Sequence, residues 1–224
     1  MIADFAKLIP ESMEHSNGRV FYSGREAFGS PSRLYVLGIN PGGAPEDHPG
    51  QTVHSHTKWV MECAPCNWSA YRDERWHGGL PGESGIQPSL RHLFCVVGLD
   101  PGTVPASNIV FARSSTTAKY PRKFDADAEK CWAFHREVID RLSVEVVVVV
   151  GNSQGAFVRE RLKTNRFVKR WIDKNARPWK SAWYRNFEGR RLSVVVLAHP
   201  TRGHQWTRTA SDPTALVHEA LNCY

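Results

Sequence analysis

The chain has 224 residues, of which 41% are hydrophobic, so it can enclose one substantial core, and we expect a single domain over residues 1–224. Its 29 Lys and Arg residues outnumber its 22 Asp and Glu residues, and the resulting charge of +7 favours a polyanionic partner such as nucleic acid. No apolar run approaches the ~20 residues of a membrane span, and residues 1–17 lack the order of a secretory signal. We therefore expect a cytoplasmic protein associated with the nucleoid.

Short apolar runs predict the strands of a sheet. They are residues 34–38, 109–112, 144–151 and 192–198. Each run is largely β-branched and lacks sustained polar alternation, which is typical of strands buried on both faces. Helical patterns cover residues 89–97, 128–142, 152–162 and 213–223. Buried strands separated by helices predict an α/β fold with a mainly parallel sheet, helices on both faces, and a functional site at the carboxyl ends of the strands.

The basic and aromatic residues outside these runs predict general structural roles, which are exposure on a helix for the cations and packing for the aromatic rings. The cations between Arg159 and Arg170 are expected on the solvated face of a helix. Most tryptophans are expected to pack in the core or under loops, because aromatic side chains supply a large buried area. These are Trp68, Trp76, Trp171, Trp179 and Trp183.

Two strand ends carry residues suited to catalysis. The first strand ends in GINPGG (Gly38 to Gly43), where glycines and a proline let the backbone approach a ligand and Asn40 offers an amide that donates and accepts hydrogen bonds. The last strand ends in HPTRGHQW, which begins at His199. Facing each other across the sheet edge, Asn40 could position water and His199 could stabilise developing negative charge. The simpler alternative is a turn asparagine and a histidine that only caps its strand.

These strand ends resemble the motifs of an enzyme superfamily. GINPG after the first strand and HPT after the last resemble the two principal motifs of the uracil-DNA glycosylase superfamily. Three further stretches agree in order. PGQ (residues 49–51) resembles the segment after the first motif, IQPSLRHLF (86–94) the loop and helix that grip the DNA backbone, and VVVVGNSQGAF (147–157) the third-strand passage.

The resemblance implies a three-layer α/β/α sandwich around a four-stranded parallel sheet. It implies an enzyme that flips uracil out of single- or double-stranded DNA and hydrolyses its N-glycosidic bond, leaving an abasic site and free uracil. No cofactor and no metal are needed, and a monomer is expected. Asn40 would orient the attacking water, and His199 would stabilise the departing uracil anion through its O2.

The resemblance also assigns the surrounding residues. The substrate pocket is expected to include Gly38, Ile39, Pro41, Gly42, Gly43, Asp47, His56, Arg113 and Ser114. Contacts with DNA are expected from Pro88, Ser89, Thr201, Arg202, His204, Gln205 and Trp206. Trp206 or Gln205 would fill the stack left by the flipped base, and Arg202 would hold a phosphate. Asp47 is a conceivable second base.

Three positions depart from the family pattern. Gly42 stands where the best-known branch has a tyrosine that excludes the methyl group of thymine. The asparagine that reads the uracil edge is expected after the second strand, but residues 112–114 are Ala, Arg and Ser. The aromatic residue that stacks on uracil is expected after PGQ, where His54, His56 and Trp59 are the nearby candidates. The range of substrates is therefore open.

Two other functions fit parts of the sequence. A DNA-binding protein of the same fold would use Asn40 and His199 only to hold its loops. A serine hydrolase would use the G-x-S-x-G stretch at residues 151–155, with Ser153, Asp173 and His199 as its triad. The hydrolase leaves GINPGG unexplained and ranks below the glycosylase.

Metal-ligand spacings occur without the partners that a metal needs. Cys63 and Cys66 are spaced like a thiolate pair, but the other cysteines are scattered. His48, His54 and His56 fall in the loop that the resemblance assigns to substrate and DNA. We expect no metal, and the odd count of five cysteines favours reduced thiols.

Overall fold

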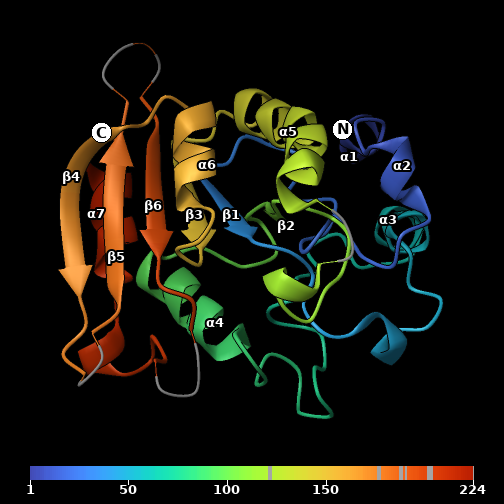
Figure 1. Cartoon of the computed structure of the whole chain (residues 1–224), viewed down its shortest axis with the longest axis horizontal. Helices are drawn as coiled ribbons and strands as arrows, with labels where there is room; N and C mark the ends of the chain where they lie inside the picture. Colours follow the sequence, from blue (N-terminus) through green and yellow to red (C-terminus); the bar gives the residue numbers. More distant parts are fainter. Residues whose placement is uncertain (121–122, 176–177, 187–188, 190, 201–203, 224) are drawn as a thin grey trace.

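One mixed sheet of six strands runs through the molecule (Figure 1). The computed structural model describes residues 1–120, 123–175, 178–186, 189, 191–200 and 204–223. The strands are β1 Leu34–Gly38, β2 Ala106–Asn108, β3 Val146–Val150, β4 Arg166–Ile172, β5 Lys180–Arg185 and β6 Ser193–Leu197. The helices are α1 Ile2–Ala6, α2 Glu11–Glu14, α3 Val53–Glu62, α4 Gln87–Val96, α5 Phe124–Arg141, α6 Gly155–Arg161 and α7 Ala215–Asn222. Short 3-10 helices cover Pro45–Asp47, Thr117–Lys119 and Thr209–Ser211.

The strand order is β2-β1-β3-β6-β5-β4. The first four of these strands are parallel, which confirms a mainly parallel sheet in an α/β fold. Strands β5 and β4 are antiparallel and extend the sheet beyond β6, so the expected count of four strands is wrong. Strand β4 falls within the basic stretch expected to be helical. Its sequence RFVKRWI is rich in aromatic and β-branched residues, and this strand propensity, satisfied by pairing with β5, outweighs the run of cations.

Helices cover both faces of the sheet (Figure 1). Tyr35, Val147 and Val194 are register partners, so their side chains share one face. Helices α5 and α6 lie on this face: the Tyr35 hydroxyl is 2.8 Å from Nδ1 of His135 on α5, and Gly155 of α6 packs against the Val196 side chain. Helix α7 contacts β3, β5 and β6 from the opposite face.

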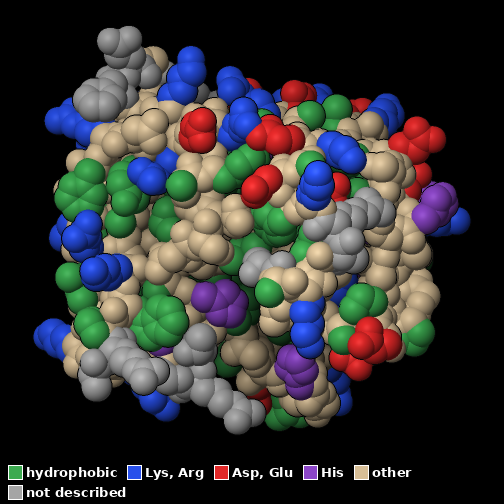
Figure 2. Space-filling view, in the orientation of Figure 1, with side chains coloured by type: hydrophobic (Ala, Val, Ile, Leu, Met, Phe, Trp, Pro, Cys, Tyr) green, Lys and Arg blue, Asp and Glu red, His purple; other side chains and the backbone are tan. Residues whose placement is uncertain are grey.

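Charge is distributed unevenly over the molecule. Figure 2 shows Lys and Arg side chains across one face, whereas Asp and Glu side chains gather over its upper and right-hand parts. The left-hand part, over β4 and β5, combines basic and hydrophobic side chains. No helix in the described ranges is both long and apolar enough to span a membrane.

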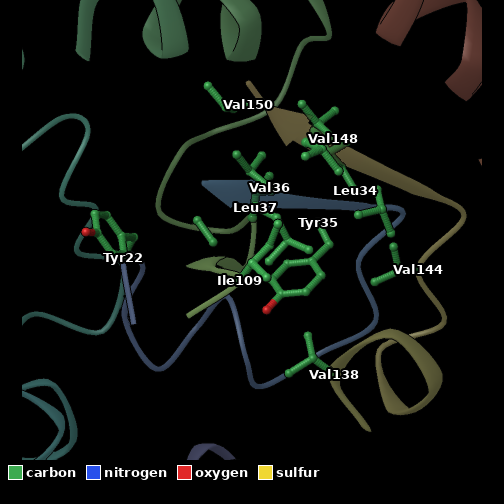
Figure 3. Close-up of a cluster of buried hydrophobic side chains, with 14 of the residues drawn as sticks. Tyr22, Leu34, Tyr35, Val36, Leu37, Ile109, Val138, Val144, Val148 and Val150 are labelled. Carbon is green, nitrogen blue, oxygen red and sulfur yellow. The ribbon is translucent and has the colours of Figure 1, made fainter. Parts of the chain in front are cut away.

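The core is formed by side chains that point alternately to the two faces of the sheet. In the close-up of Figure 3, Tyr35 and Val36 point to opposite sides of β1, and Val138 of α5 lies on the Tyr35 side. Every residue of β3 is buried, as is every residue of β6. The sheet is thus a rigid base from which the loops at the carboxyl ends project.

Strand β2 lies three residues earlier than the apolar run at residues 109–112 predicts. That run is buried, but it continues past the strand: Ile109 N donates to Gly38 O at 2.9 Å, and Val110 N donates to Ile39 O at 3.1 Å. The N-terminal segment covers it, since Arg19 N donates to Phe111 O at 3.0 Å. Burial under a loop, rather than in a strand, therefore explains the apolar sequence, and Asn108 becomes the residue that ends β2.

Candidate active site

Three loops meet at the carboxyl end of β3. Gly151 follows the strand with φ +112°, a conformation that favours glycine. A Cβ atom on Gly151 would lie 2.8 Å from Cδ1 of Ile39 and 3.9 Å from Cβ of His199. Ile39 follows β1 and His199 follows β6, with β3 between them in the sheet. The GINPGG and HPT motifs, about 160 residues apart in the sequence, are therefore neighbours because Gly151 has no side chain.

The Asn40 side chain is fixed through its nitrogen. Nδ2 donates to the carbonyl oxygen of Pro41 at 2.9 Å and to that of Ser114 at 2.8 Å. Ser114 N donates to Pro41 O at 3.1 Å, which ties the loop after β2 to the loop after β1. No residue within the described ranges donates to Oδ1 of Asn40. Its orientation is thus set by two carbonyls, and it presents one acceptor oxygen that can bind a water proton.

Arg113 is bonded to the loop that follows β1. Its side chain is buried, and its Nε donates to Oδ1 of Asn17 at 2.8 Å. Nη1 donates to Gly42 O and Nη2 donates to Oε1 of Gln51. All three guanidinium nitrogens have partners in the protein, which orient the side chain toward Asn17, Gly42 and Gln51. The expected place of Arg113 in the substrate pocket stays a prediction. Its role is to fix the backbone between Gly42 and Gln51.

The glycines of the first motif differ in what surrounds them. A Cβ on Gly38 would lie 2.0 Å from Oδ1 of Asn108, so glycine there leaves room for the asparagine. Gly43 has φ +88°, and a Cβ there would meet Nε2 of His48 at 2.9 Å. Gly42 is exposed and has nothing within 4 Å of its Cβ position. The loop therefore opens to solvent at Gly42.

Asn108 is a functional candidate that the sequence analysis did not identify. It pairs in register with Gly38, and its side chain passes directly over that glycine at the end of β1. Asn108 is 4% exposed, and its Nδ2 has no hydrogen-bond partner among the described residues. A buried amide without a partner costs stability, which favours a role with a ligand. The signal was the expected asparagine after the second strand, but the predicted strand ends at residue 112, four residues after the observed end at Asn108.

His199 lies at the end of β6 next to a buried histidine. The residue is exposed, yet partial desolvation lowers the pKa of His199, and the nearby His204 lowers it further, while a backbone hydrogen bond at Pro200 opposes the shift. His199 is therefore neutral near pH 7. A neutral imidazole can donate one N–H to an oxygen that becomes negatively charged.

A buried contact between a histidine and an aspartate lies close to His199. Nδ1 of His204 is 2.8 Å from Oδ2 of Asp173, and both side chains are fully buried. Asp173 also accepts hydrogen bonds from Asn175 and from Trp179 N. Asp173 follows β4 and not a helix, and its histidine partner is His204, so the triad of Ser153, Asp173 and His199 is not assembled. Burial likewise rules out the expected contact of His204 with DNA in this conformation.

The expected wedge is part of the core. Trp206 is fully buried, its Nε1 donates to Ala198 O at 3.1 Å, and its backbone N donates to Oγ of Ser89 at 3.2 Å. Trp206 thus connects α4 with the residue that follows β6, and because both are buried, neither Trp206 nor Ser89 is available for DNA in this conformation. The exposed tryptophan nearby is Trp179, which is 43% exposed, with its ring centroid 5.8 Å from that of His204.

The remaining residues predicted at the site differ in how far they are exposed. Thr201 and Arg202 lie outside the described residues. Gln205 and Pro88 are half-buried, and Asp47 is exposed on a 3-10 helix. His56 is 5% exposed, packs against Trp59 and Trp68, and has no partner for either ring nitrogen among the described residues. A base cannot stack on a covered ring, so the expected stacking role of His56 is wrong for this conformation.

Within the described ranges, no three side chains among His, Cys, Asp and Glu come together as metal ligands. Cys63 and Cys66 are both exposed, and Sγ of Cys66 accepts a hydrogen bond from Arg25 at 3.3 Å. No family model matches the sequence. No curated protein matches it either. The chemistry of the strand ends therefore carries the functional assignment.

Two buried histidines predict that folding is sensitive to acid. Burial, with Arg19 and Arg113 nearby, lowers the pKa of His56 to about 3, and burial lowers the pKa of His135 to about 4. The unfolded chain takes up protons at these residues near pH ~6.5 and the native protein does not, so the free energy of unfolding decreases as the pH falls below that value. Urea titrations at pH 7 and pH 5 should differ by about 2 kcal/mol per histidine.

The variant His56→Phe isolates one of these contributions. Phenylalanine keeps the aromatic contacts with Trp59 and Trp68 and cannot be protonated. We expect this variant to lose about 2 kcal/mol less than the original protein between the two pH values. An undiminished loss would mean that His56 is protonated in the native state at pH 5.

Proposed function

We propose that the chain is a monofunctional uracil-DNA glycosylase, which extrudes uracil from DNA and hydrolyses its N-glycosidic bond. One observation carries the proposal: the loop after β1 and the histidine after β6 meet across Gly151, where a Cβ would lie 2.8 Å from Ile39 and 3.9 Å from His199. The two motifs that suggested the superfamily thus share one edge of the sheet. The parallel strands β2-β1-β3-β6, with helices on both faces, are compatible with the α/β/α sandwich of that superfamily.

Each strand end supplies one step of the chemistry. Asn40 offers Oδ1 to a water molecule and orients it toward the sugar carbon, where positive charge develops as the bond to the base breaks. An amide cannot take the proton as a carboxylate would, so the contribution of Asn40 is orientation. The proton that the water loses on attack is taken up by the uracil anion, which leaves as neutral uracil. Neutral His199 donates an N–H to O2 of the departing uracil, which carries the negative charge.

Asn108 is suited to recognition of the base. Uracil presents an oxygen acceptor at C4 and an N–H donor at N3, and an asparagine amide can pair with both through its nitrogen and its oxygen. The Nδ2 of Asn108 has no partner within the described residues and lies at the strand end next to β1. Binding of uracil would satisfy this buried donor, which favours the base over an empty site.

The test is release of free uracil from uracil-containing oligonucleotides, without added metal. We expect the purified protein to leave abasic sites and the variant Asn40→Ala to do so more slowly, with little change in DNA affinity, because Asn40 orients water and does not bind the backbone. The matched control is Ser153→Ala at the same edge of the sheet, where the side chain is exposed.

The outcomes separate the candidate functions. Uracil release that is unaffected by Ser153→Ala agrees with the glycosylase. Ester hydrolysis that is lost in Ser153→Ala would identify the serine hydrolase. If the protein binds oligonucleotides but releases no base from single or double strands, the alternative of a DNA-binding protein without catalysis is supported.

A further inference from the structure

The hairpin of β4 and β5 has one face that none of the described helices lies over in Figure 1. Its register places Phe167 opposite Tyr184 and Ile172 opposite Lys180, so these side chains share a face. The same face continues to Val194 and Val196 of β6, which α6 covers. Figure 1 shows that α6 lies over β6 and β3 and leaves β4 and β5 bare in this view. Phe167 is 51% exposed and Ile172 is 47% exposed.

This face combines aromatic rings with unpaired cations. The guanidinium carbon of Arg170 lies 5.6 Å from the ring centroid of Phe167, and that of Arg159 on α6 lies 4.0 Å from the ring centroid of Tyr184. Within the described part of the chain, no carboxylate forms an ion pair with Arg159, Arg170 or Lys180. We call this set the hairpin face. It comprises Arg159, Phe167, Arg170, Ile172, Lys180 and Tyr184.

The opposite side of the same strand has a different arrangement. Lys169 pairs in register with Trp183, which is 2% exposed. Nζ of Lys169 lies 2.7 Å from a carboxylate oxygen of Glu219 on α7. The cation on the covered side of β4 is therefore neutralised within the protein. The cations of the hairpin face have no carboxylate partner among the described residues and can bind an anionic partner. Figure 2 agrees, because basic and hydrophobic side chains alternate over this region without acidic ones.

The hairpin face adjoins the candidate active site. Strand β5 is antiparallel to β6, so it begins where β6 ends, at the edge that carries His199. Nδ2 of Asn152 donates to Lys180 O at 3.1 Å, which ties the loop after Gly151 to the first residue of β5. A chain that leaves the site at this edge can continue along β5 without crossing a helix.

We propose that the hairpin face binds the single-stranded DNA that flanks the reacting nucleotide. Exposed rings accept unpaired bases by stacking, and the cations between the rings neutralise the phosphates. A folded duplex keeps its bases stacked inside and offers the rings nothing, so the pairing of aromatic and basic side chains favours a single strand. This inference rests on the proposed function for the position of the reacting base.

The test measures binding of a uracil-free single-stranded oligonucleotide by fluorescence anisotropy over a range of salt concentrations. Phe167→Ala should weaken binding roughly tenfold through the loss of one stacked base. Arg170→Gln should lower the slope of log K against log salt by ~0.7, the value for one phosphate contact to a single strand. Lys169→Gln is the matched control, with the same loss of charge on the opposite side of the same strand, and should change neither quantity.

Equal weakening by Lys169→Gln and Arg170→Gln would overturn the inference, because net charge alone would then explain binding. Binding unchanged in Phe167→Ala and Arg170→Gln would overturn it as well. So would a dimer in sedimentation equilibrium that Phe167→Ala dissociates, because the face would then bind a second copy of the chain.

The two proposals fail in different ways. If all variants release uracil and oligonucleotide binding is unchanged in Phe167→Ala and Arg170→Gln, the proposal for the hairpin face is rejected and the proposed glycosylase function is retained. If those two variants bind the oligonucleotide more weakly and the protein releases no base, the DNA-binding role of the hairpin face is retained and the proposed glycosylase function is rejected.

Discussion

His199→Ala is expected to slow uracil release by about 10²-fold or more under single-turnover conditions. Breaking the N-glycosidic bond leaves negative charge on the base, and the Cβ atom of His199 lies 3.9 Å from the Cβ position of Gly151, which also borders Ile39 of the loop that carries Asn40. In the proposed mechanism, the imidazole of His199 stabilises this charge. Desolvation lowers the pKa of His199, so the side chain is already a neutral donor at pH 7 and needs no proton before it acts. A preorganised donor of this kind contributes to the transition state and little to substrate binding.

The comparison needs a histidine that lies away from this edge. His218 is exposed on α7, and within the described residues its ring lies at hydrogen-bond distance only from the Asn222 side chain of the same helix. His218→Ala should keep the rate of the unmodified protein, and both variants should bind a uracil-containing oligonucleotide as it does. An unchanged rate in His199→Ala would remove this histidine from the chemistry.

Asn108→Leu is expected to reduce uracil release by about 10²-fold, because the replacement has a similar shape and offers neither a donor nor an acceptor to the base. The same change should leave the free energy of unfolding unchanged or raise it. The reason is that Nδ2 of Asn108 is buried without a partner in the described structure, so its removal abolishes a desolvation penalty and breaks no hydrogen bond.

Rate and stability must therefore be measured on the same protein. Urea unfolding of Asn108→Leu, followed beside single-turnover release, separates recognition from packing. A large fall in stability with a proportionate fall in activity would show that Asn108 supports the fold. Full activity with unchanged stability would show that the base is read elsewhere.

The parallel part of the sheet could be predicted because its strands are apolar and β-branched over their whole length. Strands β1, β3 and β6 lie within the predicted ranges 34–38, 144–151 and 192–198. Strand β2 could not be placed in the same way, since Ala-Ser-Asn has little strand propensity and the apolar run after it is buried by the N-terminal segment. Because the predicted strand ends four residues after the observed one, Asn108 was not recognised as the residue that ends β2.

The errors at the candidate site have a common cause. His204 and Trp206 were expected to meet DNA because they are a histidine and an aromatic residue in a loop at a sheet edge. In the structure both are buried and bonded to groups remote in sequence, which are Asp173 for His204 and Ser89 for Trp206. Whether a loop side chain faces outward depends on such long-range partners, which sequence pattern does not specify. The antiparallel hairpin was missed for the same reason.

The open space at Gly42 has a consequence for genome safety. Among the described residues, no atom other than those of Gly42 and its chain neighbours lies within 4 Å of the Cβ position there. In the proposed glycosylase, no side chain at this position would therefore collide with the methyl group that distinguishes thymine from uracil. For the proposed glycosylase, one remaining source of discrimination is the cost of extrusion, which is lowest for bases that are mispaired or unpaired. We expect thymine opposite adenine to be protected by its own Watson–Crick pair, and thymine opposite guanine to be exposed to attack.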